Sequence, residues 1–251
     1  MVRLEELTAF CDERTRRRDI VDFPGAQNGL QFANRGSVSR IGAAVDAGLG
    51  PFREAASRGI QFLIVHHGMF WSPFAPVTGT VYERARTLLE ADCAVYGSHL
   101  PLDLHADIGN NVLLARQLGL EIERSFLPYE GNDIGRIVRA GLTRSELRER
   151  LRRHYPETLT AIEFGSDRIE RAAVLTGSGA SAVGELAAAG VDTLITGELK
   201  QHVFNQAEEE RLNLYCCGHY ATEVHGVRAL AEEAAGRFGL PWEFIETGCP
   251  L

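Results

Sequence analysis

Short apolar runs alternate with segments of helical spacing along most of the chain. The first apolar runs cover residues 41–45, 62–65 and 94–96, and each is typical of a buried strand. Apolar residues at helical spacing lie between these runs, near 52–57 and 81–90. This alternation predicts βαβ units around a largely parallel sheet.

The alternation resumes after a turn-rich break that contains Pro128, Gly131 and Asn132. Because the break separates two runs of α/β pattern, we place a domain boundary there. The expected fold is α/β with two lobes: residues 1–125, joined by 219–251, form the first lobe, and residues 126–218 form the second. Further helices are expected at 4–17, 108–118, 144–154, 180–189, 203–210 and 221–237, and further strands at 137–140, 159–164, 172–175, 193–195, 212–216 and 242–245.

Composition and charge narrow the class of protein. The 251 residues are 45% hydrophobic, which is enough to bury a sizeable core. A formal net charge of −8 argues against a surface that wraps nucleic acid by neutralising phosphates. Five cysteines without CxxC spacing, and the lack of a signal peptide or long apolar run, favour a cytoplasmic protein without a membrane anchor.

Two adjacent histidines follow one of the predicted strands. His66 and His67 come directly after the apolar run at 60–65 and before Gly68. Successive side chains of a regular strand point to opposite faces, so at a strand end the two histidines can address different metal ions. The carboxyl edge of a parallel sheet is also where α/β proteins place ligands.

Asp103 is a further candidate ligand. It lies between His99 and His105 in a loop after the strand at 94–96, and Pro101 stiffens that loop. The alternative is that Asp103 caps the helix expected from residue 108, although Asp107 is closer to its start.

His219 and Glu223 form the last candidate cluster. They are four residues apart at the start of a predicted helix, and this spacing puts both on one face. The alternative is an ion pair on an exposed turn. Taken with the other clusters, the pair favours metal binding.

The candidate ligands are too few to saturate two first-row metal ions. Structural zinc sites are normally closed by four protein ligands, whereas open positions are typical of catalysis or substrate coordination. Two neighbouring ions can lower the pKa of water and stabilise an oxygen in a transition state. We therefore expect a dinuclear metal site between the lobes, with two divalent ions drawn from Zn, Fe, Mn, Co or Ni.

Two other features are candidate anion-binding sites. Lys200 is the only lysine among the 26 basic residues, and it follows the predicted strand at 193–195. The glycine-rich stretch at 176–181 stands between a strand and a helix, so it forms either a tight turn or a phosphate site. It lacks the lysine of a P-loop.

Several ordered motifs together resemble the NGG-one-interacting factor three-like family, whose members are also called GTP cyclohydrolase I type 2 homologs. The motifs are Asn28-Gly29-Leu30-Gln31, the His66-His67-Gly68 block, His99 to Asp103 with Ile108-Gly109-Asn110-Asn111, Thr196-Gly197-Glu198, and Gly218 to Glu223 followed by Gly226 to Leu230. By this resemblance, His66, His67, Asp103, His219 and Glu223 match the dinuclear metal ligands of the family.

The resemblance also implies an assembly and an activity. Family members look like two-lobed subunits of a toroidal homohexamer, and the short length matches the form without an inserted domain. The implied function is a metal-dependent hydrolase of a small, nucleotide-like substrate, with Lys200 as an anion contact. Glu198 and His99 are then candidates for ligand orientation or proton transfer.

Two other functions remain as alternatives. A non-enzymatic protein would use the same ligands for metal handling or partner regulation. A ring that encloses nucleic acid would need a basic inner surface, but the arginines at 14 and 16–18 are explained more simply as a solvated helix end.

Overall fold

Two sheets, each with its own helices, account for most of the secondary structure. The computed structural model describes residues 1–71 and 75–251. Contacts within the chain group into two compact units: unit 1 is residues 1–102 with 226–248, and unit 2 is residues 103–225 with 249–251. Each unit has its own hydrophobic core.

Unit 1 is built on a sheet in the order β13-β4-β5-β6-β2. Strands β13, β4, β5 and β6 are parallel, and β2 pairs antiparallel with β6. The central strands are buried along nearly their whole length, as expected for a parallel sheet covered on both faces. The strands are β2 (Gly29–Phe32), β4 (Ile41–Asp46), β5 (Phe62–His67), β6 (Ala94–Gly97) and β13 (Trp242–Phe244), besides a small pair of β1 (Val2–Arg3) and β3 (Ser37–Val38).

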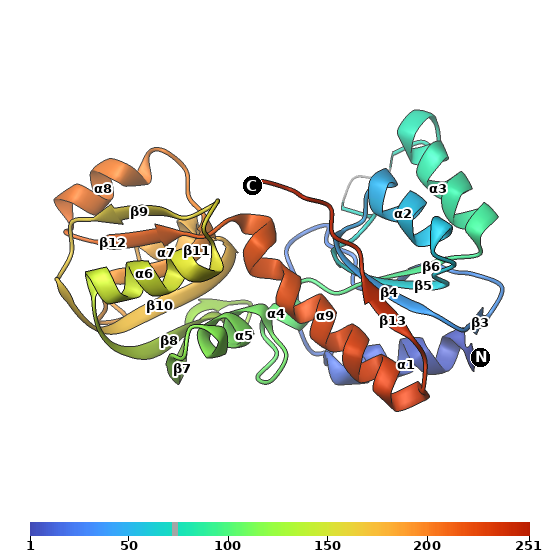
Figure 1. Cartoon of the computed structure of the whole chain (residues 1–251), viewed down its shortest axis with the longest axis horizontal. Coiled ribbons are helices and arrows are strands. Elements are labelled where there is room, and N and C mark those ends of the chain that lie inside the picture. The colour runs from blue at the N-terminus through green and yellow to red at the C-terminus, as the bar shows by residue number, and fades with distance from the viewer. Residues whose placement is uncertain (72–74) are drawn as a thin grey trace. The chain divides into compact units, whose positions relative to one another are not determined.

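Helices α2 (Leu49–Ser57) and α3 (Gly79–Ala91) cover one face of this sheet (Figure 1). Phe52 of α2 and Leu88 of α3 are almost fully buried in one cluster with Leu63 of β5. Each helix turns buried apolar residues inward, Phe52 and Ala55 in α2 and Leu88 in α3.

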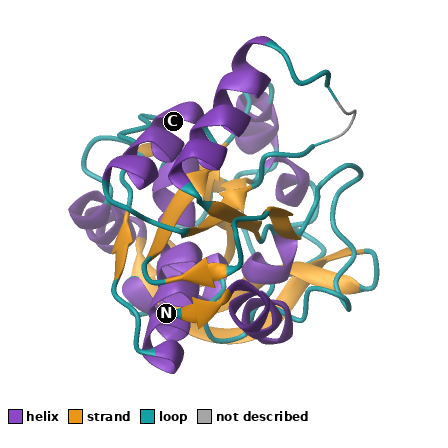
Figure 2. Cartoon of the chain, turned by 90° about the vertical axis from the view of Figure 1, so that its right-hand side faces the viewer, coloured by secondary structure: helices purple, strands orange, loops and turns teal. Residues whose placement is uncertain are grey.

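Helix α1 (Leu4–Arg14) and the later part of α9 (His219–Phe238) lie on the opposite face of the unit 1 sheet (Figure 1). They are joined by a two-pronged ion pair, in which the Arg14 guanidinium donates to both carboxylate oxygens of Glu233 at 2.6 and 2.9 Å. Figure 2 shows the helices in purple flanking the orange strands. The βαβ units predicted from the sequence are thus present in unit 1.

Unit 2 contains a mixed sheet in the order β7-β8-β10-β11-β12-β9. Strands β10, β11 and β12 are parallel, whereas the pairs β7–β8, β8–β10 and β9–β12 are antiparallel. The expectation of a largely parallel sheet therefore fails here. The strands are β7 (Glu121–Tyr129), β8 (Asn132–Thr143), β9 (Thr160–Glu163), β10 (Arg168–Ser178), β11 (Thr193–Glu198) and β12 (Asn213–Cys216).

The turn-rich break near residue 130 has a local explanation. It is the tight turn of the β7–β8 hairpin, where Glu130 and Gly131 both have positive φ. The predicted boundary near residue 126 therefore falls inside unit 2, and the chain passes from unit 1 to unit 2 at residues 102 and 103.

Helices α5 (Asn110–Gln117) and α6 (Arg144–His154) pack on one face of the unit 2 sheet through a buried cluster that includes Leu114 and Leu151. The other helices of this unit are shorter than the sequence suggested: α7 covers Ala180–Val183 and α8 covers Val203–Glu209. The helix expected over 180–189 ends early, since turns follow residue 183.

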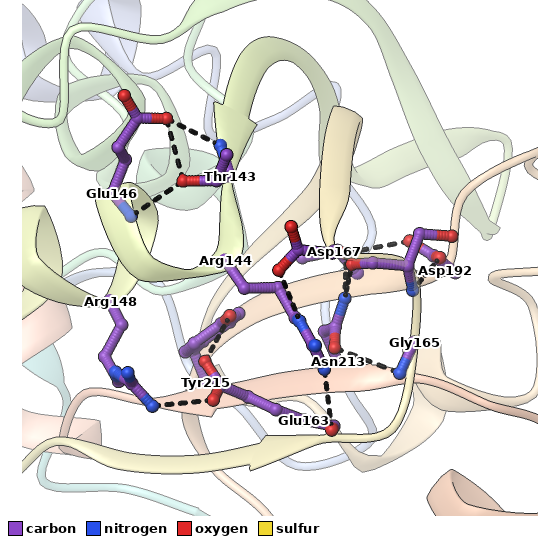
Figure 3. A network of polar contacts seen from close by, with 12 residues as sticks. Thr143, Arg144, Glu146, Arg148, Glu163, Gly165, Asp167, Asp192, Asn213 and Tyr215 are labelled. Carbon is purple, nitrogen blue, oxygen red and sulfur yellow. Dashed lines mark hydrogen bonds and ion pairs between the residues drawn. The ribbon is translucent and has the colours of Figure 1, made fainter.

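A polar network joins α6 to the edge strand β9 (Figure 3). Thr143 caps α6 in a reciprocal capping box with Glu146. The Glu163 carboxylate of β9 accepts hydrogen bonds from Arg148 at 2.7 Å and from the Tyr215 hydroxyl at 2.9 Å. These bonds hold the edge strand against both the helix and strand β12.

Candidate metal centre

The adjacent histidines are the last two residues of β5, whereas the sequence predicted that the strand ends just before them. Strand β4 ends beside them, because Asp46 is the partner of His67 in the parallel register. Strand β6 ends on the other side at Gly97, and Ser98 and His99 follow directly. Three strand ends therefore bring polar side chains to one edge of the unit 1 sheet.

Each of the two histidines is oriented through its Nδ1 atom. His66 Nδ1 lies 2.9 Å from the carbonyl oxygen of Ser98, and His67 Nδ1 lies 2.8 Å from Oδ1 of Asp46. An oxygen acceptor at Nδ1 fixes the tautomer and directs Nε2 away from the acceptor, which is the usual arrangement of metal-binding histidines.

His99 is oriented in the same manner. Its Nδ1 lies 2.8 Å from Oδ1 of Asp22, and its backbone N–H donates to Oδ1 of Asn28 at 2.8 Å. Burial raises the pKa of the Asp22 carboxyl, but hydrogen bonds from His99, Asn28 and the Phe23 amide outweigh it and lower that pKa below its ordinary value. Asp22 is thus an ionised acceptor, and neither Asp22 nor Asp46 was recognised from the sequence.

The three histidines form one group. One ring nitrogen from each of His66, His67 and His99 lies within 4.8 Å of the other two. The ring centroid of His66 is 4.9 Å from those of both His67 and His99. Three oriented imidazoles suit Zn, Fe, Co or Ni, so the donor set fits a divalent transition metal.

The motif at residues 28–31 supports this group. Gln31 accepts a hydrogen bond from the Met69 amide at 2.6 Å and donates to the Gln27 carbonyl. A side-chain carbon at Gly68 or Gly97 would overlap the amide group of Gln31. A larger residue at either position would therefore displace the end of the Gln31 side chain from the ends of β5 and β6.

His219 is placed between two carboxylates of unit 2. Its Nε2 lies 3.1 Å from Oε2 of Glu223, one turn along α9, and its Nδ1 lies 3.1 Å from Oε1 of Glu198 at the end of β11. The hydrogen bond with Glu223 is the main reason that the pKa of His219 is raised to about 9, against the opposing effect of burial. The predicted helical pair is therefore present, and Glu198 contacts it directly.

Asp103 ends the short helix α4 (Leu100–Asp103) and does not lie in a loop. Its Oδ1 accepts a hydrogen bond from Asn110 Nδ2 at 2.7 Å, and Arg136 donates to the next carbonyl, that of Leu104, at 2.7 Å. Asp103 caps no helix, since α5 begins after Gly109 without a side-chain cap. The asparagine motif at 108–111 thus holds Asp103 in place.

The glycine-rich stretch at 176–181 runs from the end of β10 through Gly179 into α7. The amide of Thr176 donates to Asn111 Oδ1 at 2.8 Å, and the amide of Gly177 donates to Thr222 Oγ1 at 3.1 Å. Because these donors bind protein acceptors, they do not form a phosphate cradle. Gly177 has a φ of +65°, and a side-chain carbon there would overlap the Glu223 carboxylate.

The five predicted ligands are divided between the units. His66 and His67 belong to unit 1, whereas Asp103, His219 and Glu223 belong to unit 2. Of the predicted orienting residues, Glu198 contacts His219, and His99 joins the histidine group itself.

Comparison with known proteins identifies the family. A profile of Duf34/NIF3 (NGG1p interacting factor 3) matches residues 3–249. The chain belongs to this family. The resemblance inferred from the motifs is therefore confirmed.

Relatives span nearly the whole chain. The GTP cyclohydrolase 1 type 2 homolog of Deinococcus radiodurans is 41% identical over 222 residues, which cover 87% of this chain and 84% of the relative. Among solved structures, TTHA1606 from Thermus thermophilus is 36% identical with a TM-score of 0.87, and the ybgI protein, of unknown function, is 32% identical with a TM-score of 0.92. Both structural matches cover 100% of both chains. Among the described residues, no helix combines the length and apolar character needed to cross a membrane.

Proposed function

We propose that the chain is a metal-dependent hydrolase that holds two divalent ions and acts on a small, nucleotide-like substrate. The observation that carries this proposal is the pair of His66 and His67, in which each Nδ1 is held by an oxygen acceptor and the ring centroids lie 4.9 Å apart. Such orientation costs free energy to build and is typical of histidines that bind metal through Nε2.

The proposed ligands are His66 and His67 of unit 1 with Asp103, His219 and Glu223 of unit 2. The chain passes between the units at residues 102–103, 225–226 and 248–249. Asp103 and Glu223 lie at or near the first two of these passages, which supports a site that takes ligands from both units. Divalent ions in such a site supply Lewis-acid chemistry, since they lower the pKa of water and stabilise negative charge on oxygen.

The protein's own groups have separate roles in the proposal. Glu198 positions His219 through the contact at Nδ1. His99 holds a proton at Nδ1 against the ionised Asp22 carboxylate, so its Nε2 can receive or donate a proton beside the substrate. Phe23 and Trp71 flank the His99 ring, at centroid distances of 5.7 and 5.1 Å, and limit the access of water to it.

The relatives support the substrate class and the assembly. Several are named GTP cyclohydrolase 1 type 2 homolog, which favours a nucleotide or a related compound as the substrate. The family resemblance also supports a toroidal homohexamer, for which the molar mass in solution from light scattering is the test.

The test of the function is elemental analysis of untagged protein, coupled to a hydrolysis screen of GTP, other nucleotides and phosphorylated metabolites. We expect two transition-metal ions per chain, and turnover that is lost on chelation and restored by adding metal back. Two bound ions without turnover of any compound would contradict the hydrolase and favour metal handling. Absence of bound metal would contradict the whole proposal.

A further inference from the structure

Unit 2 contains a cavity beside the candidate metal ligands of that unit. Its volume is about 510 Å³, within the range of about 300–1,000 Å³ that is usual for small-molecule sites. Its walls come from the edge strand β9, the segment that follows β11, the start of α8, the end of β12 and the last two residues, Pro250 and Leu251. Residues that characterise these walls are Thr160, Ile162, Glu198, Lys200, Val203 and Phe204.

Lys200 contributes one positive charge to this cavity, which Glu198 also lines. It is the only lysine of the chain, and it lines the cavity. Within residues 1–71 and 75–251, no ion-pair partner of Lys200 is found. A lysine ammonium on a flexible stem can bind an anionic group from several directions, unlike the planar guanidinium of arginine.

The remaining wall is largely apolar and includes an aromatic ring. Ile162 and Val203 line the cavity together with Phe204, whose side chain is 44% exposed. Phe204 contacts Phe164 edge-on, with the ring centroids 5.6 Å apart. An exposed aromatic pair is suited to packing against a flat, apolar ring.

Glu198 fixes the direction of a ligand in the cavity. Glu198 lines the cavity, and its carboxylate lies 3.1 Å from His219 Nδ1. Because a carboxylate repels an anion, the anionic end of a ligand belongs at Lys200, and a hydrogen-bond donor belongs toward Glu198. A ligand in this orientation would present its uncharged end beside His219.

The β9 wall is held in a fixed position. Glu163, next to Ile162 in the strand, is bound by Arg148 and by the Tyr215 hydroxyl, and its carbonyl oxygen accepts from Arg144 at 3.0 Å (Figure 3). A wall that is already ordered reduces the entropy lost on binding.

We propose that this cavity binds an anion that carries a flat apolar ring, with the anionic group at Lys200 and the ring against Phe204. That this ligand is also the substrate of the metal centre rests on the proposed function. Binding itself requires only the residues of unit 2 that line the cavity.

The test is calorimetric titration of the full chain with three probes: adenosine 5′-monophosphate, adenosine and inorganic phosphate. These probes represent the ring with the anion, the ring alone and the anion alone. Titrations are done on protein as purified and on protein dialysed free of metal. We expect the nucleotide to bind about tenfold or more tightly than either adenosine or phosphate, in both preparations.

Variants assign the binding to the cavity. Lys200→Gln should weaken nucleotide binding about tenfold and leave adenosine binding unchanged, and Lys200→Arg should retain most of the affinity. Phe204→Ala should weaken both the nucleotide and adenosine. Arg152→Gln removes one exposed charge from α6, outside the cavity, and should change nothing.

Two results would overturn the inference: no nucleotide binding by the wild-type chain at millimolar concentration, or equal effects of Lys200→Gln and Arg152→Gln. The metal content of Lys200→Gln, measured in parallel, separates this inference from the proposed function. If Lys200→Gln no longer binds the nucleotide but keeps its metal, the cavity is the nucleotide-binding site. If neither the wild type nor any variant holds metal, but the nucleotide still binds and Lys200→Gln weakens that binding, the proposed metal-dependent function is wrong and the inference about the cavity stands.

Discussion

The two units present their candidate ligands in different ways. In unit 1, each histidine is anchored by an oxygen acceptor at Nδ1. In unit 2, His219 meets a carboxylate at both ring nitrogens, Glu198 at Nδ1 and Glu223 at Nε2. A metal ion can approach Nε2 of the unit 1 histidines without disturbing their anchors, whereas at His219 it must displace the proton shared with Glu223. The unit 1 histidines are therefore already oriented for metal binding, whereas His219 must release a proton when it binds metal.

Removal of a ligand should give the largest effect. We expect His67→Ala and Glu223→Gln each to weaken metal binding more than about 100-fold, because even loss of an orienting partner costs about 10–100-fold. Elemental analysis after gel filtration measures the retained metal. His154→Ala, which removes an exposed histidine of α6, is the matched control. Retention of both ions by His67→Ala would show that this histidine is not a ligand.

Removal of an anchor should give a smaller effect that is specific to unit 1. Asp46→Asn leaves His67 in place but weakens the acceptor at Nδ1, so metal affinity should fall about 10–100-fold. A competition titration with a chromogenic chelator measures this affinity. Asp19→Asn, at an exposed aspartate of the same unit, should have wild-type affinity. If both variants behave alike, the anchor has no role in metal binding.

The pH dependence should be specific to unit 2. Because the pKa of His219 is raised to about 9 in the metal-free protein, binding there should weaken by about tenfold per pH unit between about pH 8 and pH 6. Glu198→Gln removes one carboxylate, lowers that pKa and should reduce this dependence. Nuclear magnetic resonance titration of the His219 ring gives the pKa itself. A pKa of His219 near 6.5 in the metal-free wild-type chain would contradict this explanation of the pH dependence.

The same shift affects the stability of the metal-free chain. The folded-state pKa of His219 lies above the unfolded value of 6.5, so its ion pairs stabilise the fold fully below pH 6.5. This contribution should disappear as the pH rises through about 9. Urea unfolding of wild type and His219→Gln across this range should give curves that converge at high pH. If the difference in unfolding free energy between wild type and His219→Gln were the same at every pH, protonation of His219 would not contribute to stability.

The smallest expected effect concerns backbone geometry near Glu223. Gly177 and Gly190 both have positive φ, but only at Gly177 would a side-chain carbon overlap the Glu223 carboxylate. We expect Gly190→Ala to cost about 1–3 kcal/mol of unfolding free energy from strain alone. Gly177→Ala should cost more and also lower metal content, as chemical denaturation and elemental analysis would show. Unchanged metal content in Gly177→Ala would mean that Glu223 can move without loss of the site.

Local sequence pattern predicted the parallel strands of unit 1, but it missed the antiparallel edge strand β2 of that unit and the antiparallel pairing in unit 2. In unit 1, parallel strands and their helices leave a direct trace in apolar periodicity, and the residues after each strand lie at one sheet edge. In unit 2, the residues of β7 are mostly exposed and carry little apolar signal. Its hairpin turn, with Gly131 and Asn132, has the same composition as a linker and suggested a domain boundary.

The histidines could be found from the sequence, but two of their anchors were not. Asp46 follows the apolar run at 41–45 just as His67 follows its own run, so the pairing of neighbouring strand ends was an available signal. Asp22 gave no such signal. It lies far from His99 in the sequence, and the long-range packing of its loop brings the two together.

The most direct test of the central claim is anomalous diffraction from a crystal of metal-loaded protein, recorded at the absorption edge of the bound metal. We predict two peaks per chain that share the ligands His66, His67, Asp103, His219 and Glu223. Peaks without contact to these side chains, or metal bound by only one unit, would contradict the account.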